Sequence, residues 1–297
     1  MVSAADHRGS AAHEASEVLE EDATGNIKGI YSDIRSALRS PFVPDLFLTL
    51  AREPDYLQIA WRQLHTNVQT VYFERCSDEL RAQAVKAVAA LIPTPTAAPA
   101  DATGIVQTYH YVVPKVLLAV TALRVATTGQ RPKLVELSGE DKRQVSPGVP
   151  DSMATPSPVA PEDAEPQVAA VFEDIRSTLG VRSIDAEFRA IAAWPEYFDS
   201  AWRDFKTIQE HGEYRRLRRD LTRMADEAVL AFPFRLDLSP HTLRHCGLTE
   251  SSLDAVRSTL DRFQLLLPLL ALGTASLAVG ALGADAASAS PFPAHVQ

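Results

Sequence analysis

The sequence is poor in cysteine and in positive charge, and each shortage argues against a class of protein. It contains 2 cysteines, Cys76 and Cys246, in 297 residues. So few cysteines argue against a disulfide framework and favour a reducing compartment, so we expect free thiols and a cytoplasmic protein. The formal net charge is −9. An acidic balance argues against nucleic-acid binding, and we expect no basic surface for it.

The familiar catalytic signatures are also missing. The sequence has no P-loop, no Rossmann glycine fingerprint, no HExxH motif and no nucleophile elbow. His241 and His245 have the spacing of metal ligands beside Cys246, but no second pair of ligands accompanies them. Two surface histidines are the simpler interpretation, so we expect no metal site. For His110, inside an apolar stretch, we expect a core histidine bonded to a backbone carbonyl.

Two segments of the chain differ in composition from the rest. Residues 1–26 lack the apolar region of a signal peptide, and their composition predicts a mobile N-terminal tail. Residues 131–166 are rich in proline, charge and small side chains, which predicts an extended linker over the surface; a disordered spacer is the alternative. No stretch alternates with period two for long enough to form a strand, and helical spacing prevails. The chain is therefore predicted to be all-α.

One stretch occurs twice. Residues 33–62 and 174–203 align without a gap at an offset of 174 − 33 = 141, and 12 of the 30 aligned positions are identical. A repeat this long is about the size of a small domain. It predicts two similar helical halves, residues 27–130 and 167–297, related by a pseudo-two-fold axis.

The longest uncharged run is Leu265 to Gly283, which is long enough to cross a membrane. It contains Pro268, however, and aligning Pro268 with Pro114 matches the run to a stretch of the first half that carries Lys115. We therefore expect a central helix buried between the halves and no membrane contact. A membrane span is the less favoured alternative.

The two copies diverge most just before their short central helices. The first copy has Asp45 there, and the second has Asp185 and Glu187. Capping of a helix N-terminus needs only one short carboxylate, so it is the simplest role for Asp45 and Asp185. Glu187 lies two residues beyond the presumed cap and is less well explained by capping.

Several motifs resemble those of the group I 2-haloacid dehalogenases, the DehI-type halocarboxylic acid dehalogenases. They are the DIR-x-x-L opening of the repeat, FRAIAAWP at 188–195, PKVLLAVTAL at 114–123 and SPFP at 290–293. The resemblance covers nearly the whole chain and implies an all-α pseudo-dimer with a buried site between its halves and no cofactor. It also implies that a carboxylate activates a water, which displaces halide from C2 of a small 2-haloalkanoic acid with inversion and no covalent intermediate.

The resemblance implies site residues position by position. Glu187 stands where the family has its catalytic aspartate, and the neighbouring serine is replaced by Ala186. The substrate-binding candidates are Phe42, Asp45, Val113, Val116 and Ala186. Val113 replaces an asparagine that assists the water, Val116 a tyrosine, Phe42 a tryptophan and Asp45 a phenylalanine.

These departures keep an alternative open. A divergent member of the family could bind or transform another small polar molecule. Asp45 and Glu187 facing each other across the interface would suit a cationic or neutral ligand. Either way the expected partner is a small molecule, and a homodimer stays open.

Overall fold

The computed structural model describes residues 17–92, 94–129 and 137–296. Regular structure in these ranges is helical, apart from two isolated β-bridges, Thr70 with Gln144 and Val145 with Val296. The prediction of an all-α protein is confirmed for the described residues. Residues 1–16 of the predicted tail and residues 131–136 of the predicted linker lie outside the described ranges.

The first half contains five helices: α1 Gly25–Leu38, α2 Asp45–Leu50, α3 Pro54–Val68, α4 Val71–Leu91 and α5 Thr103–Thr127. Two short 3₁₀ turns follow in the connection, η1 Glu140–Lys142 and η2 Pro161–Asp163. The second half contains α6 Pro166–Leu179, α7 Ala186–Ile191, α8 Pro195–Glu210, α9 Tyr214–Leu230, α10 Pro240–His245, α11 Glu250–Leu282 and α12 Ala284–Ser288.

Local sequence signals explain where many of these helices begin. Proline opens α3, α6, α8 and α10, where its missing N–H costs nothing. The hydroxyl of Thr70 accepts the Phe73 N–H at 3.1 Å and starts α4. Because of this cap, α4 begins at Val71.

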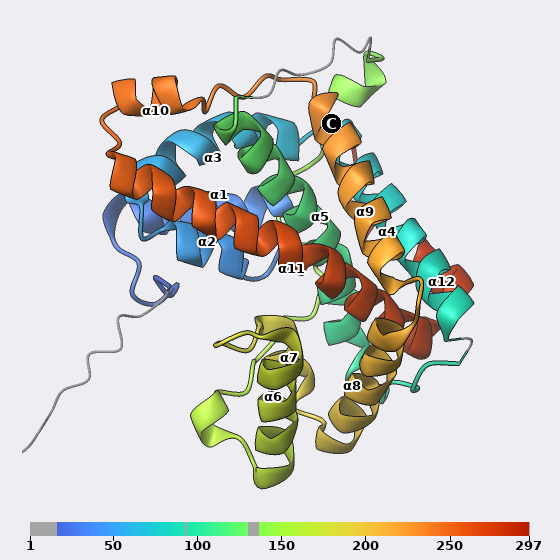
Figure 1. The fold of residues 1–297 in the computed structure, drawn as a ribbon. Helices are drawn as coiled ribbons and strands as arrows, with labels where there is room; N and C mark the ends of the chain where they lie inside the picture. The colour runs from blue at the N-terminus through green and yellow to red at the C-terminus, as the bar shows by residue number, and fades with distance from the viewer. Residues whose placement is uncertain (1–16, 93, 130–136, 297) are drawn as a thin grey trace, which may run out of the picture.

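The two longest helices, α5 and α11, pack along each other at the centre of the molecule (Figure 1). Both are long and apolar enough to cross a membrane, but 89% and 61% of their most apolar windows lie buried within the protein. That burial fits the central helix predicted for 265–283, although Leu265 itself is exposed. Two such helices by themselves are weak evidence for a membrane protein.

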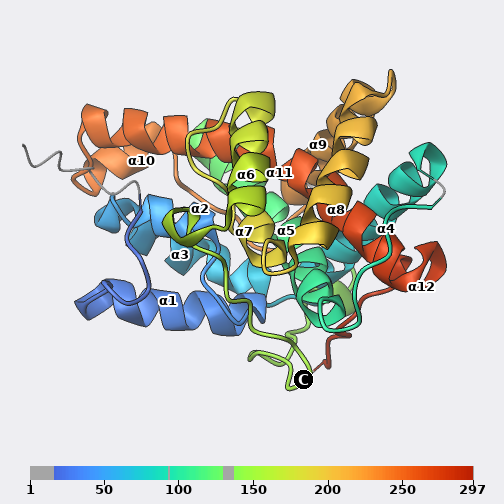
Figure 2. The same cartoon turned by 90° about the horizontal axis from the view of Figure 1, so that it is seen from below.

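Helices of each half also pack on the central helix of the other half. The short helix α2 packs on α11, and α7 packs on α5. In the same way α4 packs on α11 and α9 packs on α5. Figure 1 shows α7 and α8 below the central pair, and Figure 2, seen from below, shows α1 to α3 to one side of them. The starts of α2 and α7 are thereby brought to the interface between the halves.

The two copies of the repeat make the same local contacts. In the first copy Trp61 Nε1 donates to Asp33 Oδ2 at 2.6 Å, and in the second Trp202 Nε1 donates to Asp174 Oδ2 at 2.7 Å. Each tryptophan also packs edge-on against the phenylalanine of its short helix, with ring centroids 5.6 and 5.8 Å apart. The identical residues of the repeat therefore hold the same bond between the first and third helix of each copy.

The copies also end their first helix alike. Arg39 and Gly180, related by 180 − 39 = 141, both adopt left-handed backbone, with φ of 58° and 65°. This conformation is strained for arginine but not for glycine. The Arg39 guanidinium donates to Tyr111 Oη at 2.8 Å and to the carbonyls of Phe292 and Pro293, so it ties the C-terminal segment to the core.

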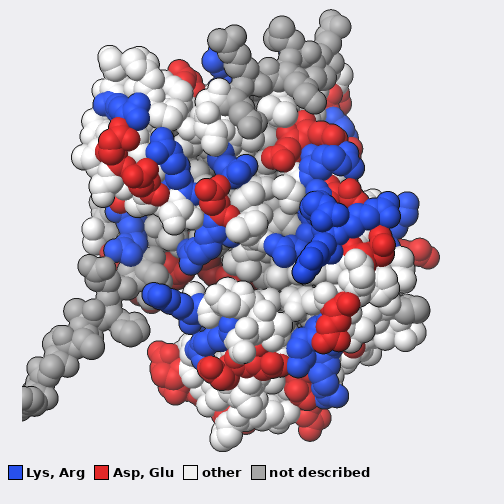
Figure 3. Space-filling model, in the orientation of Figure 1, with Lys and Arg blue, Asp and Glu red and all other residues white. Residues whose placement is uncertain are grey.

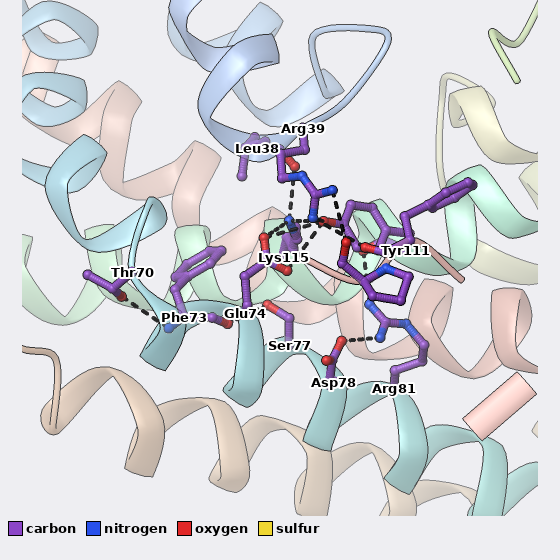
Figure 4. A network of polar contacts seen from close by, with 12 residues as sticks. Leu38, Arg39, Thr70, Phe73, Glu74, Ser77, Asp78, Arg81, Tyr111 and Lys115 are labelled. Carbon is purple, nitrogen blue, oxygen red and sulfur yellow. Dashed lines mark hydrogen bonds and ion pairs between the residues drawn. The ribbon is translucent and has the colours of Figure 1, made fainter. Parts of the chain in front are cut away.

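A buried polar network connects α5 to its neighbours (Figure 4). Lys115 Nζ donates to Glu74, to Tyr111 Oη at 2.7 Å and to the Leu38 carbonyl at 3.1 Å. Burial lowers the pKa of Lys115 to about 8, against the opposing effect of Glu74. The network joins α5 to α1 and α4.

The predicted core histidine is confirmed. His110 is buried, and its Nε2 lies 2.9 Å from the Ala287 carbonyl. Burial and Arg81 lower the pKa of His110 to about 3, so the neutral ring donates this bond. The prediction of free cysteines is also confirmed, with Cys76 buried and Cys246 exposed.

The described parts of the predicted tail and linker bond to the helical halves, the tail to the first half and the linker to both. The Val18 N–H donates to the Leu48 carbonyl at 3.0 Å, and the Val43 N–H donates to Glu20 Oε1 at 2.7 Å. In the linker the Gly148 N–H donates to the Ser36 carbonyl at 2.9 Å. Residues 17–24 therefore border α2, which brings Glu17 near the interface.

Positive charge is gathered on one part of the surface. Lys and Arg side chains gather at the start of α9 (Figure 3), where the sequence reads Tyr-Arg-Arg-Leu-Arg-Arg. Some of this charge is paired, since Arg216 contacts Glu213 at 3.1 Å and Arg223 contacts Glu227 at 3.1 Å. The acidic total hid this local basic surface, because a net charge averages over the whole chain.

Candidate active site

A small cavity lies where α2, α5, α7 and α11 meet. Its volume is about 30 Å³, which is enough to hold a water molecule. The residues that the sequence singled out all line it: Phe42, Asp45, Val113, Val116, Ala186 and Glu187. The structure thus brings together side chains from both halves that are up to 145 residues apart (187 − 42 = 145).

Most of the lining comes in equivalent pairs. At the repeat offset of 141, Pro44, Asp45 and Leu46 match Asp185, Ala186 and Glu187. At the offset set by the two central prolines, 268 − 114 = 154, Tyr109, Val113 and Val116 match Phe263, Leu267 and Leu270. Each half therefore contributes the same two surfaces, and the asymmetry of the cavity is one of side-chain chemistry.

The capping role predicted for the aspartates is wrong in an informative way. Pro44, not Asp45, is the N-cap of α2, and Asp185 occupies the N-cap of α7 without a capping bond. Instead, Asp45 Oδ2 accepts the Ala186 N–H at 3.3 Å. The first half thus satisfies a free N–H at the start of the second half's helix, across the interface.

This contact places Asp45 next to Glu187. Burial raises the pKa of Glu187 well above its ordinary value, and the nearby Asp185 and Asp45 raise it further. Burial also raises the pKa of Asp185 to about 7, again with Asp45 contributing. The pKa of Asp45 is raised by burial, while Arg189 and the Ala186 N–H oppose the change.

A further carboxylate reaches this group from the N-terminal segment. Burial raises the pKa of Glu17 to about 7, and Asp45 adds to the rise, whereas Arg189 and Arg262 oppose it. Sequence reasoning missed Glu17, because nothing in the composition of an Ala/Glu-rich segment marks one glutamate as buried. Only the path of residues 17–24 beside α2 reveals it.

Tyr109 is a second residue that sequence reasoning missed. Its hydroxyl donates to the Ala186 carbonyl at 3.2 Å, and its ring packs on Phe42 with centroids 5.1 Å apart. Tyr109 precedes Val113 by four residues, which places both on one face of α5. That spacing could have identified Tyr109 once Val113 was a candidate.

The carboxylates do not form a metal centre. Within the described ranges no group of three or more His, Cys, Asp or Glu residues has a geometry that could hold a metal ion. His241 and His245 lie on α10, with ring centroids 5.0 Å apart, and neither lines the cavity. The cavity chemistry therefore rests on carboxyl groups, a phenol and apolar side chains.

Known proteins are similar to this chain in the region that forms the cavity. The family model described as "Halocarboxylic acid dehydrogenase DehI" matches residues 41–187, a span that begins one residue before Phe42 and ends at Glu187. The chain belongs to the DehI family. The recognition made from the sequence motifs is confirmed.

Two relatives extend the match over most of the chain. An (R)-2-haloacid dehalogenase from Pseudomonas putida is 25% identical over 269 residues, covering 86% of this chain and 89% of the relative. A configuration-inverting 2-haloacid dehalogenase from Alcaligenes xylosoxydans xylosoxydans is 26% identical over 286 residues, covering 92% and 95%.

Solved structures share the fold of this DehI family member. A mutant D-2-haloacid dehalogenase in complex with D-2-CPA superimposes with a TM-score of 0.83 at 23% identity, covering 90% of this chain and 95% of the other. A D-2-haloacid dehalogenase with L-LA gives a TM-score of 0.82 at 23% identity, covering 90% and 96%. The all-helical arrangement is therefore an established one.

Proposed function

We propose that this protein hydrolyses small 2-haloalkanoic acids and that Glu187 is the general base. The single observation that carries the proposal is the position of Glu187, on a water-sized cavity that both halves enclose. A general base must lie within hydrogen-bond reach of the water that it activates, and a cavity of this size holds the water against it. The names of the two relatives support the same reaction.

The proposed reaction is a direct displacement. As the water oxygen forms a bond to C2, Glu187 accepts a proton from the water, and the carbon–halogen bond breaks with its electron pair leaving on the halide. Attack from the face opposite the halide inverts the configuration, and no bond to the enzyme forms. Glu187 then returns the proton to solvent. Its raised pKa makes it a stronger base than a free glutamate once it is ionised.

The crowding of carboxyl groups is compatible with an anionic substrate. Three ionised carboxylates around a cavity would repel the carboxylate of a haloacid. Because burial raises the pKa of Asp185 to about 7, part of this charge is neutralised by protonation near neutral pH. A protonated carboxyl group can donate a hydrogen bond to an anion. The apolar Phe42, Val113 and Val116 are suited to the carbon–halogen end.

The pseudo-dimer belongs to the same proposal. The equivalent pairs around the cavity support a pseudo-two-fold axis that relates residues 27–130 to 167–297, with 131–166 as the connection. We propose that the cavity lies on this axis, and that the protein acts in the cytoplasm on a small molecule without a cofactor. A cavity formed within one chain does not require a second copy of the protein.

A second candidate function has one observation in its favour. Asp45, Asp185 and Glu187 line one cavity with Glu17 close by, which would also suit a small cationic or neutral polar ligand. In that case the haloacid would not compete for the site. Calorimetric titration with a small amine and with 2-chloropropionate distinguishes the two, since each candidate predicts binding by only one of them.

The direct test is halide release from 2-chloropropionate and 2-bromopropionate. Glu187→Gln keeps the size of the side chain and removes the base, so we expect a loss of about 10²- to 10⁴-fold in kcat. Glu196→Gln, an exposed change on α8, is the matched control and keeps full activity. Thermal unfolding verifies that both variants fold. Absence of halide release from the wild-type protein at high concentration would overturn the proposal.

A further inference from the structure

A second cavity lies on the other side of Glu187. Its volume is also about 30 Å³, and it is enclosed by α7, α8 and α11 of the second half. Glu187 and Leu270 line both cavities and so form the partition between them. The first cavity contains three carboxyl groups; the second, which we call the aromatic chamber, contains Glu187 alone of the ionisable groups.

The walls of the aromatic chamber are apolar. Four aromatic rings line it, those of Phe188, Phe198, Trp202 and Phe205. The indole N–H of Trp202 is already bonded to Asp174, so the ring offers the chamber an apolar face. A water molecule there would find too few polar partners to replace the hydrogen bonds of the bulk liquid. The chamber is therefore suited to hydrocarbon.

One glycine shapes this chamber. A Cβ atom at Gly273 would lie 3.1 Å from Cε2 of Phe205, closer than ordinary van der Waals contact. The missing side chain therefore lets the Phe205 ring lie against α11. In the first half the equivalent residues are Ala119 (273 − 154) and Leu64 (205 − 141), which are fully buried. The aromatic chamber is thus formed by residues in which the second half departs from the first.

The first half keeps the matching region packed. The counterparts of the chamber residues on α7 and α8 are at most 4% exposed: Phe47, Leu50, Leu57, Ala60, Trp61 and Leu64. In the second half two of the residues that line the chamber, Phe188 and Ala201, are each 9% exposed. The two copies therefore differ at this place in their side chains, and the difference points to a use for the chamber.

We propose that the aromatic chamber receives the alkyl chain attached to C2 of the substrate. C2 carries a carboxylate, a halogen, a hydrogen and an alkyl group, and only the alkyl group gains from leaving water for an apolar site. With the polar groups in the first cavity, the chain passes Leu270 into the chamber. The favoured substrates are therefore 2-haloacids longer than propionate. This inference rests on the proposed function for its catalytic readout.

The experiment compares kcat/KM for 2-bromopropionate, 2-bromobutanoate, 2-bromopentanoate and 2-bromohexanoate. Each methylene that enters an apolar chamber adds about fourfold to kcat/KM, the equivalent of about 0.8 kcal/mol. We expect this gain over the first one or two added methylenes and a fall once the chamber is full. A flat or steadily falling series would overturn the inference while leaving the dehalogenase proposal intact.

Two substitutions copy the first half and should act in opposite directions. Gly273→Ala forces Phe205 inward and should lower the pentanoate-to-propionate ratio of kcat/KM by about fivefold or more, whereas Phe205→Leu should raise it. Ala119→Gly, the reverse change on α5, is the matched control and should leave the ratio within about twofold. Thermal unfolding shows whether each variant folds. Ratios that do not respond to Gly273→Ala in a folded protein would contradict the chamber assignment.

A binding measurement separates the inference from the proposed function. Calorimetry with propanoate, butanoate and pentanoate needs no halide chemistry. Affinity that rises with chain length and drops in Gly273→Ala would support the chamber even if no halide were released. Equal affinities for all three acids would overturn it even in an active dehalogenase.

Discussion

At equivalent positions the first copy of the repeat holds Leu46 and the second holds Glu187, and both side chains line the same cavity. Around them the scaffold is the same, since each copy keeps its tryptophan–aspartate bond, its edge-on ring pair and its left-handed helix end. At this cavity the two copies therefore share a scaffold and differ in their side chains. The repeated scaffold does not by itself determine the chemistry, which depends on positions such as 46 and 187 where the two copies differ.

The largest effect is expected from making the copies alike at this position. Glu187→Leu gives the second copy the residue of the first and removes the proposed base, so halide release should fall by about 10²- to 10⁴-fold. The free energy of unfolding should rise, because a buried carboxyl group is replaced by hydrocarbon. Halide assays and urea unfolding measure the two effects. Full activity in Glu187→Leu would exclude Glu187 as the base.

The reverse change sharpens the same comparison. Leu46→Glu places a second carboxyl group on the cavity, opposite Glu187. Like charges raise each other's pKa, so the rising limb of the pH profile of kcat/KM should shift to higher pH by about one unit. The wild-type limb reflects ionisation of a base whose pKa is raised, so activity increases as pH rises through it. An unchanged profile in Leu46→Glu would mean that position 46 does not share the cavity electrostatically with position 187.

The two left-handed helix ends offer a comparison of stability. Arg39→Gly copies Gly180 and relieves backbone strain, but it removes the bonds to Tyr111 and to the C-terminal carbonyls. We expect a net loss of about 2 kcal/mol and faster hydrogen exchange in residues 290–296. Gly180→Ala introduces strain alone, since no atom lies within 4 Å of its Cβ, and should cost about 1 kcal/mol. Equal losses would show that Arg39 has no anchoring role.

The tryptophan–aspartate bond should be worth nearly the same in both copies. Trp61→Phe and Trp202→Phe each remove an indole N–H from a partly exposed carboxylate, so each should cost about 1 kcal/mol beyond the loss of ring area. Urea unfolding of the two variants, with Asp33→Asn and Asp174→Asn as partners in double-mutant cycles, isolates the bond. Coupling energies that differ by more than about 1 kcal/mol would mean that the copies use the motif differently.

The parts of this structure that could be predicted from the sequence are those set by local pattern. Helical spacing, proline starts and the repeat gave the helices, and the family motifs gave six residues that line one cavity. The bond from the Ala186 N–H to Asp45 could not be predicted, because capping signals concern a residue's own helix and this bond joins two different helices. The space beside Gly273 was equally hidden, since it depends on Phe205, which lies 68 residues earlier (273 − 205 = 68).

The smallest effect tests the remaining pair beside the base, Pro44 and Asp185. Burial raises the folded-state pKa of Asp185 from 3.8 to about 7. Its contribution to stability is therefore complete at acidic pH and is lost as pH rises through that value, because the folded protein must then bury a charge. Asp185→Asn keeps the shape and removes the charge, so it should be more stable than the wild-type protein by about 1 kcal/mol at pH 8 and equal to it near pH 4. Urea unfolding across this range, with the exposed Asp163→Asn as control, measures the slope. A variant that lost stability at pH 8 would show that the Asp185 charge is favourably paired. Asp185 would then not be a costly buried charge where the first copy has the uncharged Pro44.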